Sequence, residues 1–409
     1  MSTNPERALT PVRSWLCVSV VTASLFTFVT TELMPVGLLT SLSASLNVAV
    51  GVAGLIVTLF GISAGLGVPF LVAWTRRVNR RTLLSALLAI MATGNLIVAV
   101  SPSFWPVLTS RLVMGFAHGV FWAIAVNMAM RLVPERHAGR AAAIALSGIS
   151  IGTVVGIPLG TFVGGLTSWR TTFFIWSMVC LLVLALVVAT IPSMPSENAV
   201  SVREVFALPR DNARLRSVLF AVILYVLGHF AAYTYVRPFL ENDDSASSGF
   251  ITGALIAYGI GGAAGNFIAG QMASKNFRTG LAISCGGLMV SLAFLVTVGH
   301  SPFAAIVFIT LWGISFGAAN LCQINLTLAA APDTFEAAMS INTLAYNVSI
   351  ALGALCGGLF ADRLGVGSAF GFGVALTACA VLLVLARGRK SKDSNSATDA
   401  GRDDQVIEI

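Results

Sequence analysis

One carboxylate in this chain stands apart from the others. Glu32 is the only one of the 17 Asp and Glu residues that lies inside a long apolar segment. An ionisable group in such a segment is costly and usually faces a cavity or a partner, so it marks a candidate functional site. Burial favours the protonated form of a carboxyl group, which allows proton uptake and release near neutral pH. We interpret Glu32 as a proton-binding residue; the alternative is a hydrogen-bonded or ion-paired Glu that fixes helix packing.

Arg111 is the residue that could control this proton. At 1.5 Å per residue, Glu32 lies about 13 Å and Arg111 about 9 Å from the same end of their predicted helices. A guanidinium beside a carboxyl group favours its ionised form, so a change in their separation could bind and release the proton. In the alternative interpretation, Arg111 ties its helix to backbone carbonyls of the first helix.

A second group of residues could bind a solute. His118 and Trp122 lie on the same helical face as Arg111, and an imidazole can bond a hydroxyl group or relay a proton. Amides, phenols and aromatic faces without fixed charge favour a neutral solute. Single amides and a lone His also serve helix contacts, so each of these residues has a structural alternative. The remaining candidates for the solute site are His229, Tyr233, Tyr235, Asn320, Gln323, Asn342 and Tyr346.

These residues are embedded in a strongly apolar chain. Of the 409 residues, 10% are charged and 56% are hydrophobic, and the mean hydropathy is +0.88. A soluble protein carries about 25% charged residues, so this composition predicts a membrane protein and excludes a disordered chain or a cytosolic enzyme. The four His residues are scattered and no carboxylate pair is buried, so we expect no enzyme activity and no metal site. No nucleic-acid partner is expected. The six Cys residues lie inside apolar segments and are interpreted as small buried hydrophobic residues.

The apolar segments predict an all-α membrane protein with 12 transmembrane helices. A membrane helix needs about 20 apolar residues, and Ser-, Gly- and Pro-containing turns divide the longest uncharged stretches into two spans each. The predicted spans are 15–40, 50–73, 82–100, 105–130, 139–166, 170–192, 215–240, 249–273, 279–298, 303–330, 337–361 and 366–386.

The charges between the spans predict the orientation. Of the 24 Lys and Arg residues, Arg111 and Arg237 lie within spans, Arg170 and Arg363 on one side, and the other twenty on the opposite side. Because positive loops face the cytoplasm, both termini are predicted to be cytoplasmic. The first span is expected to be retained rather than cleaved as a signal peptide.

The chain also contains an internal repeat. A shift of 198 residues superposes Gly61 on Gly259 and Gly115 on Gly313, and a shift of 203 superposes Thr31 on Thr234. Such repeats are typical of secondary transporters that bind substrate between two halves. We therefore predict an N-terminal six-helix half over residues 1–192, a cytoplasmic linker over 193–213, a C-terminal half over 214–386 and a disordered cytoplasmic tail over 387–409.

These features resemble the major facilitator superfamily, in its twelve-helix drug/proton antiporter branch. The likeness rests on the two six-span halves, the basic loop after the second span, Arg111-x-x-x-Gly115 and the antiporter-type motif Gly152-x-x-x-Gly156-Ile157-Pro158-Leu159-Gly160. The basic loop departs from the superfamily pattern, which has an acidic residue at Arg76. Of its four arginines, Arg76, Arg77, Arg80 and Arg81, only the last two fit. The gating salt bridge that this acidic residue carries in the superfamily is therefore not carried over to this chain, and sugar-efflux members also tend to lack the residue.

Four further segments are similar to bacterial sugar efflux transporters, which export arabinose and thiogalactosides. They are Thr30-Thr31-Glu32-x-x-Pro35, Phe116-Ala117-His118-x-x-Phe121-Trp122, Trp169-Arg170-x-Thr172-Phe173 and His229-x-x-Ala232-Tyr233-x-Tyr235-x-x-Pro238. The resemblance implies a proton-coupled antiporter that exports a small neutral solute, a sugar or glycoside, from a bacterial cell through the inner membrane. The alternative is a multidrug, chloramphenicol-type or nucleoside efflux pump of the same family. Such a protein needs no cofactor beyond the proton gradient, and its expected partners are the solute and the lipid bilayer, with the chain as a monomer.

Overall fold

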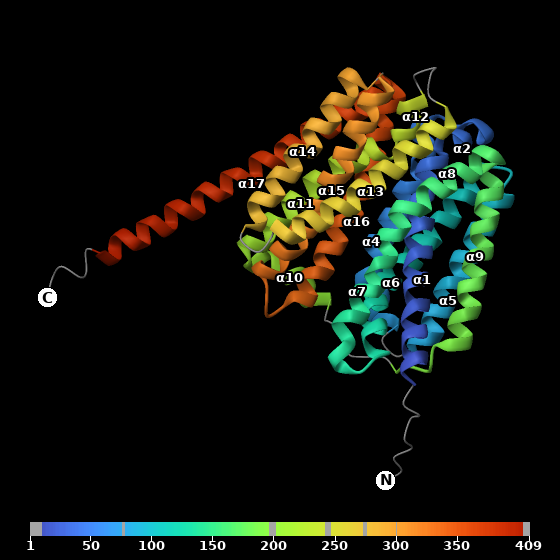
Figure 1. Ribbon diagram of the computed structural model, residues 1–409, viewed down its shortest axis with the longest axis horizontal. Coiled ribbons are helices and arrows are strands. Elements are labelled where there is room, and N and C mark those ends of the chain that lie inside the picture. Colours follow the sequence, from blue (N-terminus) through green and yellow to red (C-terminus); the bar gives the residue numbers. More distant parts are fainter. Residues whose placement is uncertain are drawn as a thin grey trace, which may run out of the picture.

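The elements of this protein are all helical wherever its structure is described. The computed structural model describes residues 10–75, 78–195, 202–241, 247–272, 276–299 and 301–403. Figure 1 shows the arrangement of the helices. In chain order, the elements are α1 (Pro11–Leu33), η1 (Met34–Leu38), α2 (Leu39–Leu46), α3 (Val50–Ala53), α4 (Leu55–Thr75), α5 (Arg80–Val100), α6 (Phe104–Arg131), η2 (Glu135–His137), α7 (Ala138–Ile151), η3 (Gly152–Gly156), α8 (Ile157–Leu166), α9 (Trp169–Thr190), α10 (Val202–Asp211), α11 (Ala213–Tyr233), α12 (Val236–Glu241), α13 (Ser248–Met272), α14 (Phe277–Val298), α15 (Pro302–Ala330), α16 (Phe335–Leu364) and α17 (Val366–Asp403).

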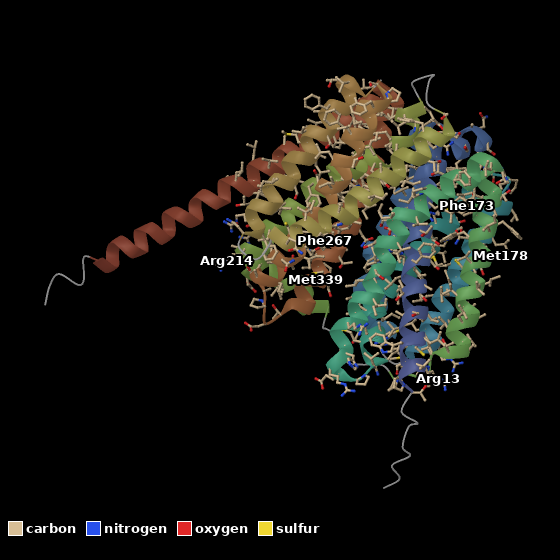
Figure 2. The ribbon with its side chains drawn as sticks, viewed as in Figure 1. Arg13, Phe173, Met178, Arg214, Phe267 and Met339 are labelled. Carbon is tan, nitrogen blue, oxygen red and sulfur yellow. The ribbon has the colours of Figure 1, made fainter. Side chains whose placement is uncertain are left out.

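The described helices confirm the predicted all-α membrane fold. Eleven helices within the described ranges are long and apolar enough to cross a membrane, or twelve when the bent pair Phe104–Trp122 and Ile124–Arg131 counts as one span. Figure 2 shows side chains filling the space between the helices. Large apolar side chains also stand on the outside of the molecule, as Phe267 and Phe162 do with exposed fractions of 69% and 52%. Such a surface suits lipid rather than water.

The helix ends follow from local chemistry. Asn79 and Asn212 precede α5 and α11, and each side-chain oxygen accepts a hydrogen bond from a backbone N–H of the first turn. These amides satisfy N–H groups that have no partner within the helix. α2 ends at Asn47 in the left-handed conformation, and α16 ends at Gly365 with φ of 87°. A positive φ is accessible to Gly and Asn at low cost, so both residues can stop a helix sharply.

The helices form two bundles that stand side by side (Figure 1). Most helices from α1 to α9 contribute to a hydrophobic core built from residues between Cys17 and Met194. Helices α11 to α17 share a second core between Ala221 and Val384, which also takes in Val36, Val57 and Ile157 of the first bundle. The two bundles therefore have separate cores and touch along an apolar interface.

The bundles repeat the same close helix packing. A Cβ atom on Gly115 would lie 2.3 Å from the carbonyl oxygen of Phe60, and one on Gly313 would lie 2.1 Å from that of Tyr258. Both members of the second pair follow those of the first by 198 residues. The glycines allow α6 to approach α4, and α15 to approach α13, at backbone distance. This matched geometry supports the internal repeat.

Two segments differ from the sequence prediction. The linker was predicted as a polar loop, but it contains α10, because Leu208 packs against an apolar cluster with Leu215 and Ile341. The segment after 386 was predicted to be disordered, whereas α17 continues to Asp403 and projects away from the bundles (Figure 1). This segment contains no proline that would stop the helix.

Candidate functional site

Glu32 lies where the first transmembrane helix is interrupted. α1 ends at Leu33, and the 3₁₀ turn η1 carries Pro35, which has no N–H to continue the α-helical bonding. The second bundle has an interruption at the related place, between α11 and α12, close to Pro238. Interrupted helices at corresponding positions of two halves are the strongest structural pointer to a transporter binding site.

The side chain of Glu32 contacts His118 of α6. Glu32 Oε2 lies 3.3 Å from His118 Nε2, and the two side chains are exposed by only 10% and 1%. The imidazole lies among aromatic rings, with its centroid 6.0 Å from that of Phe28 and 5.1 Å from that of Phe60. The two titratable groups that the sequence placed on different helices are therefore neighbours in a largely apolar setting.

Arg111 contacts the backbone of Glu32 rather than its carboxylate. Its Nη1 donates to the carbonyl of Thr31 at 2.8 Å, Nη2 to that of Glu32 at 3.0 Å and Nε to that of Ile56 at 3.3 Å. The guanidinium is completely buried and lies 4.3 Å from the centroid of the Phe60 ring. This is the structural alternative: Arg111 ties α6 to α1 and α4. It also places a buried positive charge close to the Glu32 carboxyl group.

Trp122 completes the group on α6. Its Nε1 donates a hydrogen bond to His118 Nε2 at 2.5 Å, and its ring is half-buried. The other ring nitrogen of His118, Nδ1, is buried and has no hydrogen-bond partner among the described residues. Glu32, His118 and Trp122 thus form a short chain of polar contacts, which we name the α1–α6 cluster.

The second bundle contributes a half-buried polar group. Asn320 Nδ2 donates to the Tyr346 hydroxyl at 3.2 Å, and the Tyr225 hydroxyl donates to Asn320 Oδ1 at 3.4 Å. Tyr346 also interacts electrostatically with Glu32, although the two residues lie in different bundles. The structure therefore brings Asn320 and Tyr346, both predicted from sequence, towards the α1–α6 cluster.

His229 and Tyr233 lie in an aromatic cluster inside the second bundle. His229 Nδ1 accepts a hydrogen bond from Trp312 Nε1 at 2.8 Å, and Nε2 lies 3.3 Å from the Tyr258 hydroxyl. Its ring stacks on Phe316 at 3.6 Å and on Tyr233 at 5.0 Å. Because both ring nitrogens have protein partners, this geometry favours a packing role for His229 over the predicted solute contact.

Gln323 and Asn342 bond each other between α15 and α16. Asn342 Nδ2 donates to Gln323 Oε1 at 2.6 Å and lies 2.9 Å from Thr327 Oγ1. Both amide residues are buried, with exposed fractions of 3% and 2%. This is the helix-contact alternative that the sequence left open for single amides.

The two bundles are joined at the end of the molecule where α2, α3 and α12 lie, which we call the α12 end. Asp362 Oδ1 of α16 accepts a hydrogen bond from the backbone N–H of Gly51 in α3 at 2.7 Å. The Tyr235 hydroxyl donates to the carbonyl of Ala354 at 2.7 Å and lies 3.5 Å from that of Gly51. Tyr235, predicted as a solute contact, therefore lies at this junction.

Arg237 adds a further link at the α12 end. Its Nε pairs with Glu241 at 2.7 Å, as the i, i+4 spacing predicts, and its Nη1 donates to the carbonyl of Gly37 in the first bundle. α12 is thereby tied to η1, so the two interrupted helices meet at the junction.

The glycine motif of the fifth span packs against α1. A Cβ on Gly156 would lie 2.1 Å from Thr30 Oγ1, and one on Gly160 would lie 2.6 Å from Met34 Cγ. Gly152 and Gly156 bound a π-helical turn, η3, and Pro158 is the second residue of the following helix, α8. The motif therefore sets the spacing between the fifth span and the helix that carries Glu32.

The basic loop is described only in part. Arg76 and Arg77 lie outside the described residues. The backbone N–H of Arg80 donates to the carbonyl of Met194 at 2.9 Å, and Arg81 donates to the carbonyl of Val188. The described part of the loop thus fastens the start of the linker to the first bundle.

Sequence reasoning missed a polar cluster that supports Thr31. Trp176 Nε1 donates to Thr31 Oγ1 at 2.9 Å, and Asn95 Nδ2 lies 3.4 Å from the same oxygen. A lone buried amide on the third span was the available signal, since Asn95 has no exposed surface. Asp362 was missed as well, because it lies just beyond a predicted span and not inside it.

The fold and this site define a transporter of the multi-pass membrane class. Two helical bundles meet along an apolar interface, and each contains an interrupted helix, the one in the first bundle carrying a buried carboxyl group. The chain belongs to the Major Facilitator Superfamily, whose family model matches residues 16–337. It is a transporter and not an enzyme.

Solved structures of transporters share this fold. A bacterial homolog of the human lysosomal transporter Spinster, in an inward-facing and unoccupied conformation, is 15% identical with a TM-score of 0.68 over 92% of this chain and 95% of its own. The human organic anion transporter MFSD10 (TETRAN) is 17% identical with a TM-score of 0.67 over 92% and 100%. A POT family transporter in complex with 5-aminolevulinic acid is 13% identical with a TM-score of 0.73 over 94% and 96%. The likeness at these identities concerns the fold alone.

Proposed function

We propose that this protein is a proton-coupled antiporter of the drug/proton antiporter branch that exports a small neutral solute, a sugar or glycoside, from a bacterial cell. The observation that carries the proposal is the contact between the buried carboxyl group of Glu32 and the imidazole of His118. Export is powered by the proton gradient, without a cofactor, and the chain works as a monomer in the inner membrane.

Glu32 suits the role of proton carrier because its carboxyl group is buried close to both a cation and an imidazole. The guanidinium of Arg111 is completely buried and bonds the carbonyl oxygen of Glu32, so movement of α1 against α6 would change the distance between the positive charge and the carboxyl group. His118 supplies a second titratable group at 3.3 Å, through which the proton can leave.

The solute site is proposed between Trp122 in the first bundle and Asn320 and Tyr346 in the second. All three are half-buried and offer uncharged donors and acceptors next to an aromatic face. A polyol with several hydroxyl groups can pair with such groups without displacing a charge. The electrostatic interaction between Tyr346 and Glu32 supports a solute site close to the proposed proton site.

Transport is proposed to follow alternating access between the two bundles. In the predicted orientation both termini are cytoplasmic, and the α12 end faces outward. The links of Asp362 to Gly51 and of Arg237 to Gly37 then close the outer side. Export requires these links to break so that solute leaves outward while Glu32 takes up a proton.

Solute-triggered proton movement in proteoliposomes tests this proposal. Purified protein is reconstituted with a pH-sensitive dye, and arabinose, isopropyl thiogalactoside and chloramphenicol are added in turn to wild type, Glu32→Gln and Glu135→Gln. Glu135 is the control, since it is an exposed carboxylate in η2. We expect a proton signal with a sugar or thiogalactoside in wild type and Glu135→Gln, and none in Glu32→Gln. A signal with chloramphenicol alone would contradict the sugar assignment, and an intact signal in Glu32→Gln would contradict the proton site.

A further inference from the structure

His118 Nε2 lies next to two groups, and it cannot form a hydrogen bond with both when Glu32 is ionised. The indole N–H of Trp122 is only a donor, so Nε2 must offer it a lone pair. An ionised Glu32 is only an acceptor, so Nε2 must offer it a proton instead. One ring nitrogen cannot do both at once, and the state of Glu32 therefore decides which neighbour His118 serves.

In this structure the Trp122 indole N–H is hydrogen-bonded to His118 Nε2. Trp122 Nε1 lies 2.5 Å from His118 Nε2, while Glu32 Oε2 lies 3.3 Å away. This arrangement places the imidazole proton on Nδ1 and is compatible with a protonated Glu32, because a carboxylate would face the Nε2 lone pair. The O–H of a protonated Glu32 can also point at that lone pair, but at 3.3 Å it is the longer of the two contacts and Trp122 remains the main donor. Loss of the Glu32 proton favours the other tautomer, in which Nε2–H donates to the carboxylate and Trp122 loses its acceptor.

Few other charged or titratable groups face this cluster in the described structure. Arg111 of α6 lies close to Glu32 but is bound to backbone carbonyls, and Tyr346 of α16 acts on Glu32 electrostatically. The elements α1 and α4 present the rings of Phe28 and Phe60 to the imidazole. The proton on Glu32 is thus the variable that sets the hydrogen bond of His118.

We propose that Trp122 couples the proton to the solute. When Glu32 is protonated, the Trp122 indole N–H is held by His118 and is withheld from the solute. When Glu32 is ionised, the indole N–H is released and donates to a hydroxyl or ether oxygen of the solute. Proton and solute then exclude each other through one side chain, as antiport requires. The inference rests on the proposed function and assigns Trp122 as the specificity-determining donor of that site.

Indole N–H resonances provide a test that needs no solute. The protein is labelled with ¹⁵N at the Trp indole, and the Trp122 signal is assigned by its loss in Trp122→Phe. We expect the Trp122 proton signal to move upfield as pH rises in wild type and to remain in the bonded position at all pH values in Glu32→Gln. Trp312 is the internal control, since its Nε1 bonds His229 at 2.8 Å in a cluster where no carboxylate contacts the imidazole among the described residues. A Trp122 signal as constant as that of Trp312 would overturn the proposal.

Solute affinity supplies the second readout. In wild type, the affinity for isopropyl thiogalactoside is expected to rise with pH, and in Trp122→Phe this rise is lost, with about fivefold weaker binding at high pH and unchanged binding at low pH. If Trp122→Phe weakened solute binding equally at every pH, Trp122 would be a fixed solute contact, and its proposed coupling role would be refuted.

The two proposals fail in different ways. If Glu32→Gln abolishes proton movement but the Trp122 resonance does not change with pH, proton-coupled antiport is supported and the coupling role of Trp122 is refuted. If the resonance changes with pH but Glu32→Gln still exchanges protons, the pH-dependent hydrogen bond of Trp122 is supported and another residue carries the transported proton.

Discussion

The hydrogen bond between Asp362 and Gly51 should control how often the α12 end opens. It joins α16 of one bundle to α3 of the other at 2.7 Å. The carboxylate accepts from a backbone N–H in the first turn of α3, where helical N–H groups have no partner of their own. Replacing Asp362 by Ala removes this acceptor, and we expect the populations of the transporter to shift towards the state that is open at the α12 end.

The size of this shift follows from the bond that is lost. A hydrogen bond to a charged group contributes about 1.5–3 kcal/mol, and exposure of Asp362 to solvent reduces this to about 1 kcal/mol. The ratio of open to closed molecules should then rise about fivefold in Asp362→Ala. Asp362→Asn keeps a neutral acceptor, so a rise of about twofold is expected.

Distances between spin labels at Val52 and Leu364 report this opening. Both side chains are exposed, at 38% and 71%, and they lie on the two bundles beside the bond. The labels are placed in a background without the six native cysteines. Arg363→Ala is the matched control, since it alters the neighbouring exposed residue.

Two outcomes decide the role of this bond. A larger long-distance population in Asp362→Ala, with none in Arg363→Ala, is the expected result. Gly51→Ala should act in the same direction, because its Cβ would lie 2.3 Å from the Gly358 carbonyl. Unchanged distance distributions in both Asp362 variants would refute the reasoning.

Three further predictions concern packing inside the bundles. Gly115→Ala should lower stability by about 1–3 kcal/mol, because the added methyl group meets the backbone of α4; Gly139→Ala, with open space around it, should leave the melting temperature unchanged or raise it. His229→Phe should lower stability by about 1–3 kcal/mol by leaving the Trp312 N–H buried without an acceptor, and a loss of solute binding at wild-type stability would contradict that packing role. Asn342→Leu should likewise lower the melting temperature, since it removes two buried hydrogen bonds between α15 and α16; an unchanged melting temperature with lost binding would restore Asn342 to the solute site.

Much of the fold was predictable because lipid imposes strong rules on the sequence. Twenty-residue apolar stretches and their turns located the spans, and the shift of 198 residues identified pairs such as Gly115 and Gly313 that pack in the same way. The helices beyond the membrane were not predictable by those rules. α10 packs through the partly buried Leu208 against the cluster that contains Leu215 and Ile341, and the extension of α17 carries no apolar pattern of its own.

The candidate site was predictable in its members but not in their contacts. The sequence singled out Glu32, His118 and Trp122, and the structure brings them together. Periodicity cannot distinguish a side chain that faces a neighbouring helix from one that faces the interface. Periodicity therefore did not show that Arg111 bonds backbone carbonyl oxygens or that His229 is enclosed by aromatic rings. The role of Asp362 could not be predicted from sequence. A carboxylate at a helix end resembles an ordinary surface charge, and only the structure shows that Asp362 bonds the backbone N–H of Gly51.

Glu32 is proposed to carry the transported proton, and the most direct measurement of this role separates solute exchange from proton-driven transport. Counterflow of radiolabelled isopropyl thiogalactoside between equal pH on both sides needs solute binding and bundle movement only. Accumulation driven by a pH gradient needs the proton as well. We predict that Glu32→Gln loses gradient-driven accumulation but retains counterflow, with an about fivefold higher half-saturating solute concentration because Trp122 stays bonded to His118. Loss of both activities in a folded protein would mean that Glu32 serves structure or solute binding, and retention of both would place the proton elsewhere.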